Sequence, residues 1–404
     1  MIRFGYRMLA VAIVMLMVTG CRKDDDVVMP TVCPVLPGGE TAGDTITTDS
    51  TITINEYRGL YVLCEGNMGS NKATLDYLDL QSGQYHQNIF PSRNPNQVKE
   101  LGDVGNDCKI YGSRLWLVIN CSNKVEVCEA ETARSLGHVD IPNCRFLAFH
   151  EGYAYVSSYV GPVGGTSVQG SVYKVDTLSL AIKGQVSVGY QPEEMAVVDG
   201  KLYVANSGGY SVLEGKGYDR RISVIDLKRF AVEREIEVAP NLWRVRADRY
   251  GQLWVTSRGN YGTRPGQLFL FTFNQESGQM ELSKTYDLPV TDIAFRGDSL
   301  CYLGVDNTHE EADYYSSGVI SLKSHEPVSS QLVAQSHLDG LETPYGLMVH
   351  PLTGDIYVMD ATNYVSNGVL RCYDPTGQQE KWRTFTGDIP GHACWHVKTS
   401  IIKK

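Results

Sequence analysis

The sequence predicts an all-β fold, a seven-bladed β-propeller closed by its own C-terminal strand. Three observations support this: an aromatic–aliphatic doublet recurs seven times, a turn glycine precedes each doublet, and the C-terminus supplies a strand that the first repeat lacks. Repeats of 39 to 55 residues built from short alternating strands are typical of propeller blades. A helical solenoid would instead show a 3.6-residue periodicity.

The doublet marks the second strand of each predicted blade. A glycine two to five residues before it, such as Gly200, provides the tight turn that an antiparallel strand pair needs. The seven copies are Tyr61-Val62, Trp116-Leu117, Tyr155-Val156, Tyr203-Val204, Trp254-Val255, Tyr302-Leu303 and Tyr357-Val358.

The fourth repeat shows the complete unit. Its first strand begins near Gln191 and ends at the turn Asp199-Gly200, and its second strand starts at Lys201. Residues 222–227 and 232–238 then alternate as half-buried strands do. The sequence therefore predicts four strands per blade.

The two ends of the repeat array predict how the ring closes. The chain enters the first blade at its second strand, residues 59–64, whereas a surplus segment after the seventh blade, residues 390–398, resembles an opening strand. A propeller must join its first and last blades or leave sheet edges exposed. We therefore expect residues 390–398 to complete the first blade; an open array with a frayed tail is the alternative.

Composition agrees with a large all-β domain. The chain has 40 glycines, 24 tyrosines and 42% hydrophobic residues, enough for an ample core. Its formal net charge of −10, without a basic stripe, argues against nucleic acid as a partner.

The N-terminus predicts the compartment. Arg3 and Arg7 precede an apolar run at residues 8–18, which suits a signal peptide. Residues 18–21 resemble a bacterial lipobox that would make Cys21 the lipidated first residue, and the charged run at 22–26 resembles the surface-export signal of Bacteroidetes lipoproteins. A merely solvated charge run is the alternative reading of 22–26.

These features predict three regions. They are a signal peptide at 1–20, a lipid-anchored flexible tether at 21–56 and the propeller at 57–404. The mature protein would be anchored in the outer membrane by lipid alone, facing the cell exterior.

Metal and cofactor signals are absent from the sequence. Nine cysteines remain besides Cys21, an odd number that excludes complete internal pairing, and there is no Cys-x-x-Cys. His392 and His396 share a strand face with Cys394, so packed or rim histidines are favoured over a metal pair. We expect neither a metal ion nor a cofactor.

Catalytic motifs are equally sparse, and the sequence predicts a protein that is not an enzyme. It contains no Gly-x-Ser-x-Gly and no phosphate loop. A propeller hydrolase or lyase would have to build its site from Asp107, Glu193, Asp306 and His392.

Side chains after the second strand and before the first strand of every blade emerge at one mouth of the central channel. A single asparagine there is more often a turn or cap residue. A ring of amides, aromatic rings and arginines instead favours a large ligand rich in amides or hydroxyls. The predicted ligand-binding residues are Asn67, Asn120, Arg145, Tyr159, Asn206, Tyr210, Trp243, Asn260, Tyr261, Asn307, Asn363, Tyr364 and Trp395.

Several segments carry a family resemblance. They are LCEGNMGSNKATL at 63–75, LGDVGND at 101–107 with VINCSNKVEV at 118–127, and PEEMA at 192–196 with YVAN at 203–206. They resemble the YncE-like seven-bladed propeller surface lipoproteins of gut Bacteroidetes, and within these the BtuG type. The likeness spans about residues 57–399.

The resemblance implies capture of cobalamin (vitamin B12) or related corrinoids and their delivery to a TonB-dependent transporter of BtuB type. Cobalamin would then be a bound ligand rather than a cofactor. Two other classes remain open, because fold does not fix ligand. One is a surface carbohydrate- or peptide-binding or scaffold propeller, and the other is a propeller hydrolase or lyase.

Overall fold

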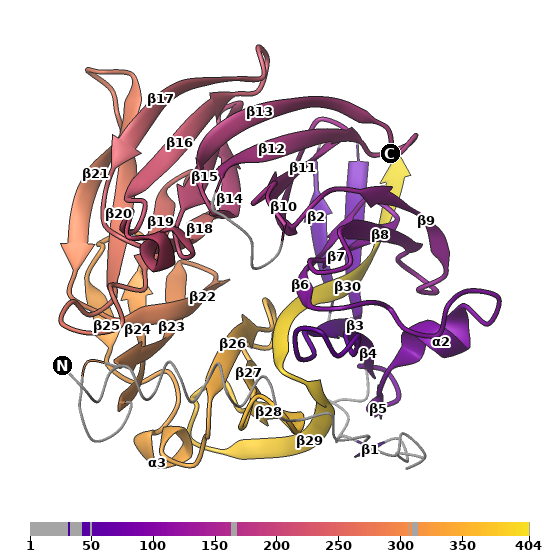
Figure 1. The fold of residues 1–404 in the computed structure, drawn as a ribbon. Coiled ribbons are helices and arrows are strands. Elements are labelled where there is room, and N and C mark those ends of the chain that lie inside the picture. The colour runs from indigo at the N-terminus through magenta and orange to yellow at the C-terminus, as the bar shows by residue number, and fades with distance from the viewer. Residues whose placement is uncertain are drawn as a thin grey trace. The chain divides into compact units, whose positions relative to one another are not determined.

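The structure, a computed structural model, describes residues 31–32, 43–48, 51–162, 168–306, 308 and 314–403. The chain divides into two compact units, Met1–Pro30 and Thr31–Lys404, and all described residues belong to the second. In that unit the described strands form seven antiparallel sheets arranged as the blades of a propeller (Figure 1).

Six of the seven blades are simple four-stranded sheets. Blade two consists of β6 (Gly105–Tyr111), β7 (Arg114–Ile119), β8 (Lys124–Glu129) and β9 (Ser135–Asp140), and blade three of β10 (Cys144–His150), β11 (Tyr153–Ser158), β12 (Gln169–Asp176) and β13 (Ile182–Tyr190). Blade four consists of β14 (Pro192–Val198), β15 (Lys201–Asn206), β16 (Arg221–Asp226) and β17 (Ala231–Glu237), and blade five of β18 (Leu242–Ala247), β19 (Leu253–Ser257), β20 (Gln267–Asn274) and β21 (Gln279–Tyr286). Blade six consists of β22 (Val290–Arg296), β23 (Ser299–Asp306), β24 (Tyr314–Ser321) and β25 (Pro327–Ser329), and blade seven of β26 (Pro344–Val349), β27 (Ile356–Asp360), β28 (Asn367–Tyr373) and β29 (Glu380–Asp388).

Blade one combines the two ends of the chain. It contains β1 (Thr31–Val32), β2 (Gly43–Thr47), β3 (Thr51–Cys64), β4 (Thr74–Asp79), β5 (Gln84–His86) and β30 (Pro390–Lys403). The described helices are short: α2 (Ile89–Arg93), η1 (Ser211–Glu214) and α3 (Gln335–Leu338).

The ring is closed by the C-terminal strand, as predicted. β30 pairs antiparallel with β3, for example Leu60 with Trp395, and so supplies the strand that the first blade lacks. The first strands of the blades contact one another in cyclic order: β30, β6, β10, β14, β18, β22, β26 and again β30. These seven strands surround the central axis.

The doublets are buried because each blade packs against a neighbour on both faces. Trp116 and Leu117 lie on opposite faces of β7: Trp116 packs with Val156 of blade three, and Leu117 packs with Leu63 of blade one. The buried apolar side chains of the described residues form seven such clusters, one at each blade boundary.

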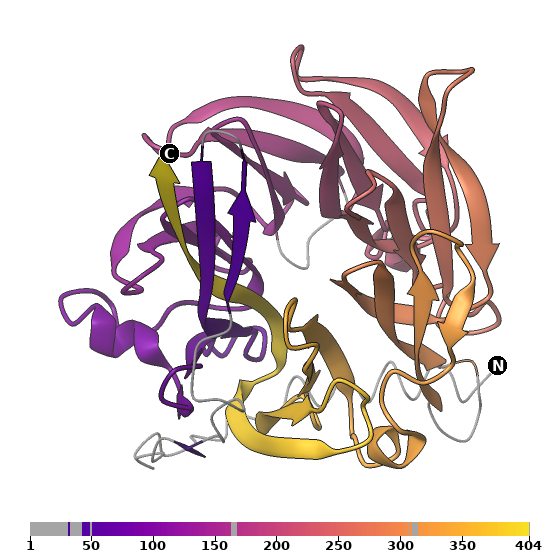
Figure 2. The same cartoon turned by 180° about the vertical axis from the view of Figure 1, so that it is seen from behind.

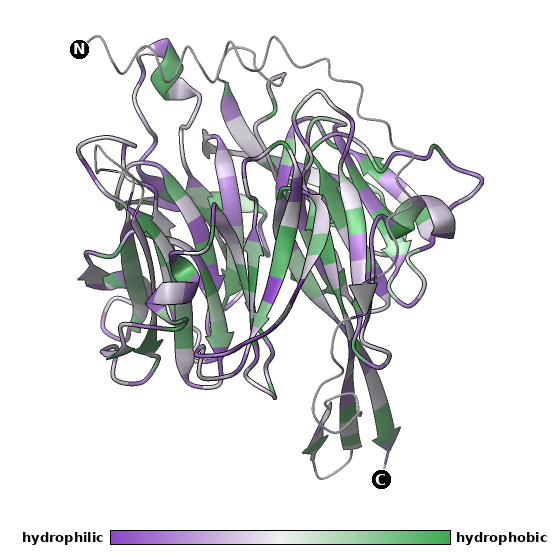
Figure 3. Cartoon of the chain, turned by 90° about the horizontal axis from the view of Figure 1, so that it is seen from below, coloured by the Kyte–Doolittle hydropathy of each residue, from purple (hydrophilic) through white to green (hydrophobic). Residues whose placement is uncertain are grey.

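A three-stranded ribbon projects from one face of the ring (Figures 2 and 3). It consists of β2, the start of β3 and the end of β30, with pairs such as Thr45 with Ile54 and Ile54 with Ser400. Part of the segment predicted to be a flexible tether, residues 21–56, belongs to this ribbon. Residues 43–47 and 51–56 are strands, because the end of β30 gives them a pairing partner that the local sequence does not reveal.

The predicted signal peptide at 1–20, Cys21 and the charged run at 22–26 lie outside the described residues. Among the residues that are described, no helix has both the length and the apolar character needed to cross a membrane.

Candidate binding site at one mouth of the channel

The start of each first strand is irregular, and this irregularity shapes the mouth of the channel. In every blade the register between the first and second strands shifts at this point, for example between Leu242 and Val245 in β18. A β-bulge changes the direction in which side chains point. In β18 it occurs at Trp243 and Arg244, which reach a cavity at the axis.

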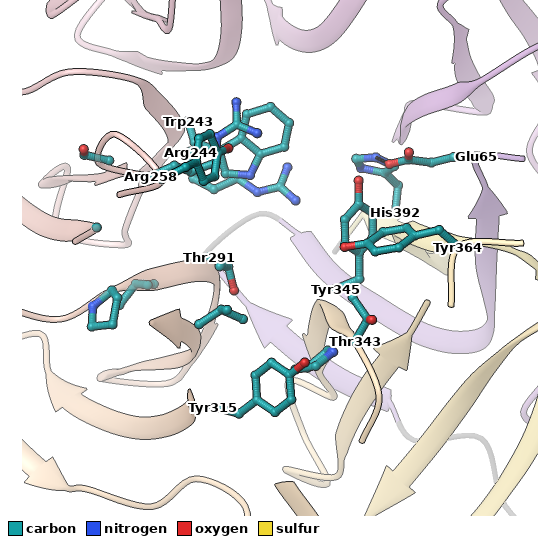
Figure 4. A pocket seen from close by; sticks show the side chains of 17 residues that line it. Glu65, Trp243, Arg244, Arg258, Thr291, Tyr315, Thr343, Tyr345, Tyr364 and His392 are labelled. Atoms are coloured by element: carbon teal, nitrogen blue, oxygen red, sulfur yellow. Dashed lines mark hydrogen bonds and ion pairs between the residues drawn. The ribbon is translucent and has the colours of Figure 1, made fainter. Parts of the chain in front are cut away.

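This mouth cavity has a volume of about 370 Å³ and is bordered by blades five, six, seven and one. Two walls face each other across it (Figure 4). One carries Trp243, Arg244 and Arg258, and the other carries Glu65, Tyr345, Tyr364 and His392.

In the first wall, two guanidinium groups lie against the indole ring of Trp243. The Arg258 guanidinium lies 3.9 Å from the centre of the Trp243 ring, and that of Arg244 lies 4.9 Å from it. Arg258 is 26% exposed and makes one long ion pair, 3.6 Å to Glu193. Its Nε is buried and has no hydrogen-bond partner within the described part of the chain. Because Arg258 also lines the mouth cavity, its guanidinium is placed to donate to a ligand there.

The charge of Arg258 is maintained despite its surroundings. Burial lowers the pKa of a guanidinium, but the neighbouring Tyr261 oxygen and Glu193 carboxylate outweigh this and raise the pKa of Arg258. The cavity therefore keeps a permanent cation on its aromatic wall.

The second wall contains a carboxylate–imidazole pair. Glu65 Oε1 lies 3.1 Å from His392 Nε2, and burial together with Glu65 raises the pKa of the Tyr345 phenol well above its usual range. Gly391 makes this contact possible. A Cβ atom there would lie 2.7 Å from the Tyr345 ring and 2.8 Å from Glu65 Oε1, so any larger residue would push these two side chains out of their positions.

The floor of the cavity is a layer of side chains from distant parts of the sequence. The ring of Phe146, which is fully buried, lies 5.3 Å from that of Trp243 and 6.0 Å from that of His392. Arg244 and His392 also line a second cavity of about 520 Å³ farther along the channel. The layer therefore lies where the two cavities meet.

Ion pairs hold the floor in place. Arg244 Nε and Arg246 Nη2 lie 3.2 and 2.9 Å from Asp292 Oδ1, and Arg246 Nε lies 3.1 Å from Glu194. Burial raises the pKa of a carboxyl group, but Arg246 and Arg244 outweigh it and lower the pKa of Glu194. The charges of the arginine and carboxylate side chains in the floor therefore neutralise one another.

Three of the predicted ligand-binding residues line the mouth cavity: Trp243, Tyr261 and Tyr364. The two tyrosines are 42% and 45% exposed, and both have left-handed backbone, with φ of 53° and 62°. Such backbone is strained for tyrosine and is concentrated at functional sites in proteins.

Three more predicted residues form a network beside the cavity. Glu193 accepts hydrogen bonds from the Tyr159 hydroxyl and pairs with Arg145 at 3.1 Å. The Tyr210 ring packs edge-on against Tyr159 at 5.7 Å and is 38% exposed. These residues support the mouth, with Tyr210 at the surface.

None of the predicted asparagines among the described residues lines the mouth cavity, and four of them bond within the protein through their side chains. Buried Asn120 and Asn206 donate to the carbonyl oxygens of Cys144 and Arg221, each at 2.8 Å. Exposed Asn260 and Asn363 accept hydrogen bonds from backbone N–H groups of their own loops.

The remaining predictions have other outcomes. Asn67 is half-buried, and its carbonyl oxygen accepts a hydrogen bond from the Ser70 N–H; it does not line the mouth cavity. Asn307 lies outside the described residues. Trp395 lines the second cavity instead of the mouth cavity. It lies three residues farther along β30 than His392, which lines both cavities.

The mouth cavity is also lined by residues that were not predicted, among them Glu65, Arg258, Thr291, Tyr315 and Thr343. Arg258 could have been found, since it directly follows the second strand at Ser257, the position class from which the asparagines were chosen. The others come from loops and bulges whose path the repeat pattern does not define.

The four candidate catalytic residues are not gathered in one cavity, although Asp107 and His392 both line the second cavity. The Asp107 carboxylate accepts the Leu147 N–H at 2.9 Å, whereas Asp306 bonds the Thr308 N–H of its own loop. Only His392 lines the mouth cavity. Across the described ranges, no three His, Cys, Asp or Glu side chains are grouped closely enough to hold a metal ion.

Comparisons with known proteins agree with the propeller fold. The family described as Domain of unknown function (DUF5074) matches residues 58–385. A search among curated proteins found no match.

Solved structures are similar at low sequence identity. A quinonprotein alcohol dehydrogenase-like protein from Bacteroides thetaiotaomicron has a TM-score of 0.57 at 10% identity, covering 92% of this chain and 100% of that one. The periplasmic gluconolactonase of Pseudomonas aeruginosa has a TM-score of 0.57 at 12% identity, covering 83% and 99%. Kuenenia stuttgartiensis hydrazine synthase has a TM-score of 0.55 at 14% identity, covering 74% and 95%. At such identities the likeness concerns the fold alone.

Proposed function

Since this chain belongs to the family described as Domain of unknown function (DUF5074), a description that assigns no ligand, we propose its function from the site. The protein is a binding protein that captures a large polar small molecule at the mouth cavity, and the ligand is cobalamin or a related corrinoid. The observation that carries this proposal is the stack of Arg258 on Trp243 in an open cavity.

The chemistry of the mouth suits such a ligand. A corrinoid has a broad apolar ring, peripheral amides and one phosphodiester group. Arg258 and Arg244 can donate to amide oxygens or to the phosphate, and the exposed rings of Tyr261 and Tyr364 can cover apolar area. A cavity of about 370 Å³ holds only part of a ligand of this size, so the rest would lie on the tyrosine rim.

The strained tyrosines support a preorganised site. Left-handed backbone at Tyr261 and Tyr364 costs on the order of 1–3 kcal/mol each, and it keeps both rings at the rim before a ligand arrives. A preorganised surface loses little conformational entropy on binding, which favours high affinity.

Delivery to a TonB-dependent BtuB-type transporter and anchoring at the outer-membrane surface through Cys21 are part of the same proposal. Their support is the lipobox-like sequence at residues 18–21 and the resemblance of residues 63–75, 101–127 and 192–206.

The direct test is calorimetry with cyanocobalamin on the purified chain and on a matched pair of variants. Tyr261→Ala removes an exposed ring at the mouth, whereas Tyr250→Ala removes an equally exposed ring, 47% against 42%, from a turn between β18 and β19. We expect tight binding by the parent, weaker binding by Tyr261→Ala and unchanged binding by Tyr250→Ala.

Absence of heat with cyanocobalamin would overturn the corrinoid assignment. In that case oligosaccharides and peptides would be titrated next, with the same two variants. Equal weakening by Tyr261→Ala and Tyr250→Ala would show that the mouth is not the site.

A further inference from the structure

Two cysteines meet where the ends of the ring join. Cys108 lies on β6, the first strand of blade two, and Cys394 lies on β30, the closing strand of blade one. These two strands contact each other along the axis. Both side chains face the same inter-blade core, in which Cys394 packs against the cluster that contains Cys108.

The two thiols share one environment. The Cys394 side chain packs against the buried cluster that contains Cys108, both residues line the same cavity, and burial together with the neighbouring Cys394 raises the pKa of the Cys108 thiol well above its usual range. Two other buried cysteines have different partners: Cys64 donates to Asp76, and Cys144 to the carbonyl oxygen of Lys124. Cys128 belongs to the same cluster as Cys108, but of these cysteines only Cys108 and Cys394 line the second cavity, so we treat these two as the pair.

The pair can be reached by a small molecule from one side. Both residues line the second cavity of the channel, the one of about 520 Å³. Cys394 is half-buried, whereas Cys108 is 2% exposed. A reagent entering that cavity meets Cys394 as the more exposed thiol.

We propose that Cys108 and Cys394 are a redox site that forms a disulfide with a small disulfide oxidant and so links the closing strand covalently to blade two. The Cys394 thiolate attacks one sulfur of the oxidant, whose other half leaves as a thiol after taking up a proton. The Cys108 thiol then gives up its proton and attacks the Cys394 sulfur, and the second half of the oxidant leaves and takes up a proton to become a thiol. The two cysteines lose two electrons and two protons in total, and the oxidant gains them.

The bond would lock the ring. β30 is otherwise held in blade one by its ladder with β3 and by apolar packing. A cross-link between β30 and β6 restricts the unfolded chain over most of its length, which stabilises the folded state. The inference is independent of the ligand proposed above.

Oxidised glutathione tests the proposal on the purified full chain. The folded protein is incubated with it, remaining thiols are alkylated under denaturing conditions, and peptides are identified by mass spectrometry without reduction. We expect a linked peptide pair containing Cys108 and Cys394, its loss on reduction, and a higher melting temperature of the oxidised protein.

Two variants sharpen the test. Cys394→Ala should abolish the linked pair, whereas Cys121→Ala, which removes another half-buried cysteine, should retain it. Separate alkylation of Cys108 and Cys394 after oxidation would overturn the proposal, as would a stable glutathione adduct on Cys394 or pairing of either residue with another cysteine. The parent experiment decides the matter even if Cys394→Ala does not fold.

Discussion

At the scale of single residues, the mouth contains charged side chains that pair closely with one another and one cation, Arg258, whose ion pair is long. Glu193 takes its hydrogen bonds from Tyr159 and Ser207 and pairs with Arg145, so Arg145 supports the site. Arg258 shares the same carboxylate only at 3.6 Å. The Trp243 ring, on which Arg258 stacks, should therefore contribute more to the affinity for the ligand than any single polar contact.

We predict that Trp243→Ala weakens cyanocobalamin binding by about 2 kcal/mol or more, as loss of a buried aromatic anchor does in other interfaces. The ring supports Arg258 at 3.9 Å and contacts the Phe146 ring of the floor. Calorimetry measures the effect, and Trp243→Phe, which keeps an aromatic face, should lose less. Equal affinities of Trp243→Ala and the parent would contradict this role.

Asn206→Ala should affect folding and leave binding unchanged. The Asn206 amide is fully buried and donates to the Arg221 carbonyl and to the Ser223 hydroxyl. Its loss leaves these acceptors unpaired, at a cost of about 1–3 kcal/mol in the free energy of unfolding. Urea denaturation measures this loss, and the exposed Asn363 provides the control, since Asn363→Ala should change stability much less.

His350 makes stability depend on pH. Its Nδ1 accepts the N–H groups of Leu352 and Thr353, and burial lowers the pKa of His350 to about 4, with Lys381 adding to and Asp355 opposing this shift. The unfolded histidine binds a proton near pH 6.5, so between about pH 6.5 and 4 the unfolded state holds more protons. Stability from this residue is full above that window and falls as the pH drops through it.

We predict a loss of roughly 3 kcal/mol across that window, from a shift of about two and a half pKa units at ~1.4 kcal/mol each. His350→Asn keeps a hydrogen-bond acceptor near Nδ1 but cannot titrate, so its unfolding free energy should decline less between pH 6.5 and 4. Parallel curves for parent and variant, measured by urea denaturation at each pH, would exclude His350 as the source.

At the scale of elements, β30 joins blade one to the end of the chain. We predict that deletion of residues 390–404 abolishes soluble expression, because it leaves β3 without its partner and exposes the apolar cluster between blades seven and one. Deletion of residues 399–404 alone shortens only the projecting ribbon, so that protein should fold. A deletion 390–404 with the parent's melting temperature would contradict closure by β30.

Much of this architecture could be predicted from sequence, because it depends on local patterns. The turn at Asp199-Gly200 and the strands around it lie within a residue or so of their predicted positions, and the missing strand of blade one implied β30. The site could be predicted less well. Whether Asn206 faces a ligand or a carbonyl oxygen depends on the path of the loop around it, which the repeat pattern does not encode.

Half of the six predicted aromatic residues line the mouth cavity, whereas none of the described asparagines does. A ring such as that of Trp243 or Tyr261 has little or no capacity to bond to its own loop, so its place near the mouth is more informative than that of an asparagine. An asparagine side chain readily bonds to its own loop, as Asn260 and Asn363 do.

At the scale of the whole described unit, the mouth and the ribbon lie toward opposite ends of β30. His392 lines the mouth cavity, Trp395 lines only the second cavity, and the pairs of Thr399 and Lys403 belong to the ribbon. A ligand at the mouth would therefore bind toward the end of the channel away from the ribbon.

Cys21→Ala should leave the propeller folded but release it from the membrane, because it removes the proposed acyl-chain attachment. Fractionation of cells into membrane and soluble parts measures this. Cys33→Ala, which alters a nearby cysteine outside the lipobox-like sequence, should stay attached. Recovery of Cys21→Ala in the outer membrane would contradict lipid anchoring at this residue.

Closure of the ring by β30 also determines when the protein can finish folding during its synthesis. A chain is made from its N-terminus, yet blade one receives its innermost strand only when β30, the last fourteen residues of the described chain, has been added. A chain that stops before β30 keeps an open sheet edge on β3 and an uncovered apolar surface, which proteases and chaperones recognise. The propeller can therefore be completed only after β30 has been made.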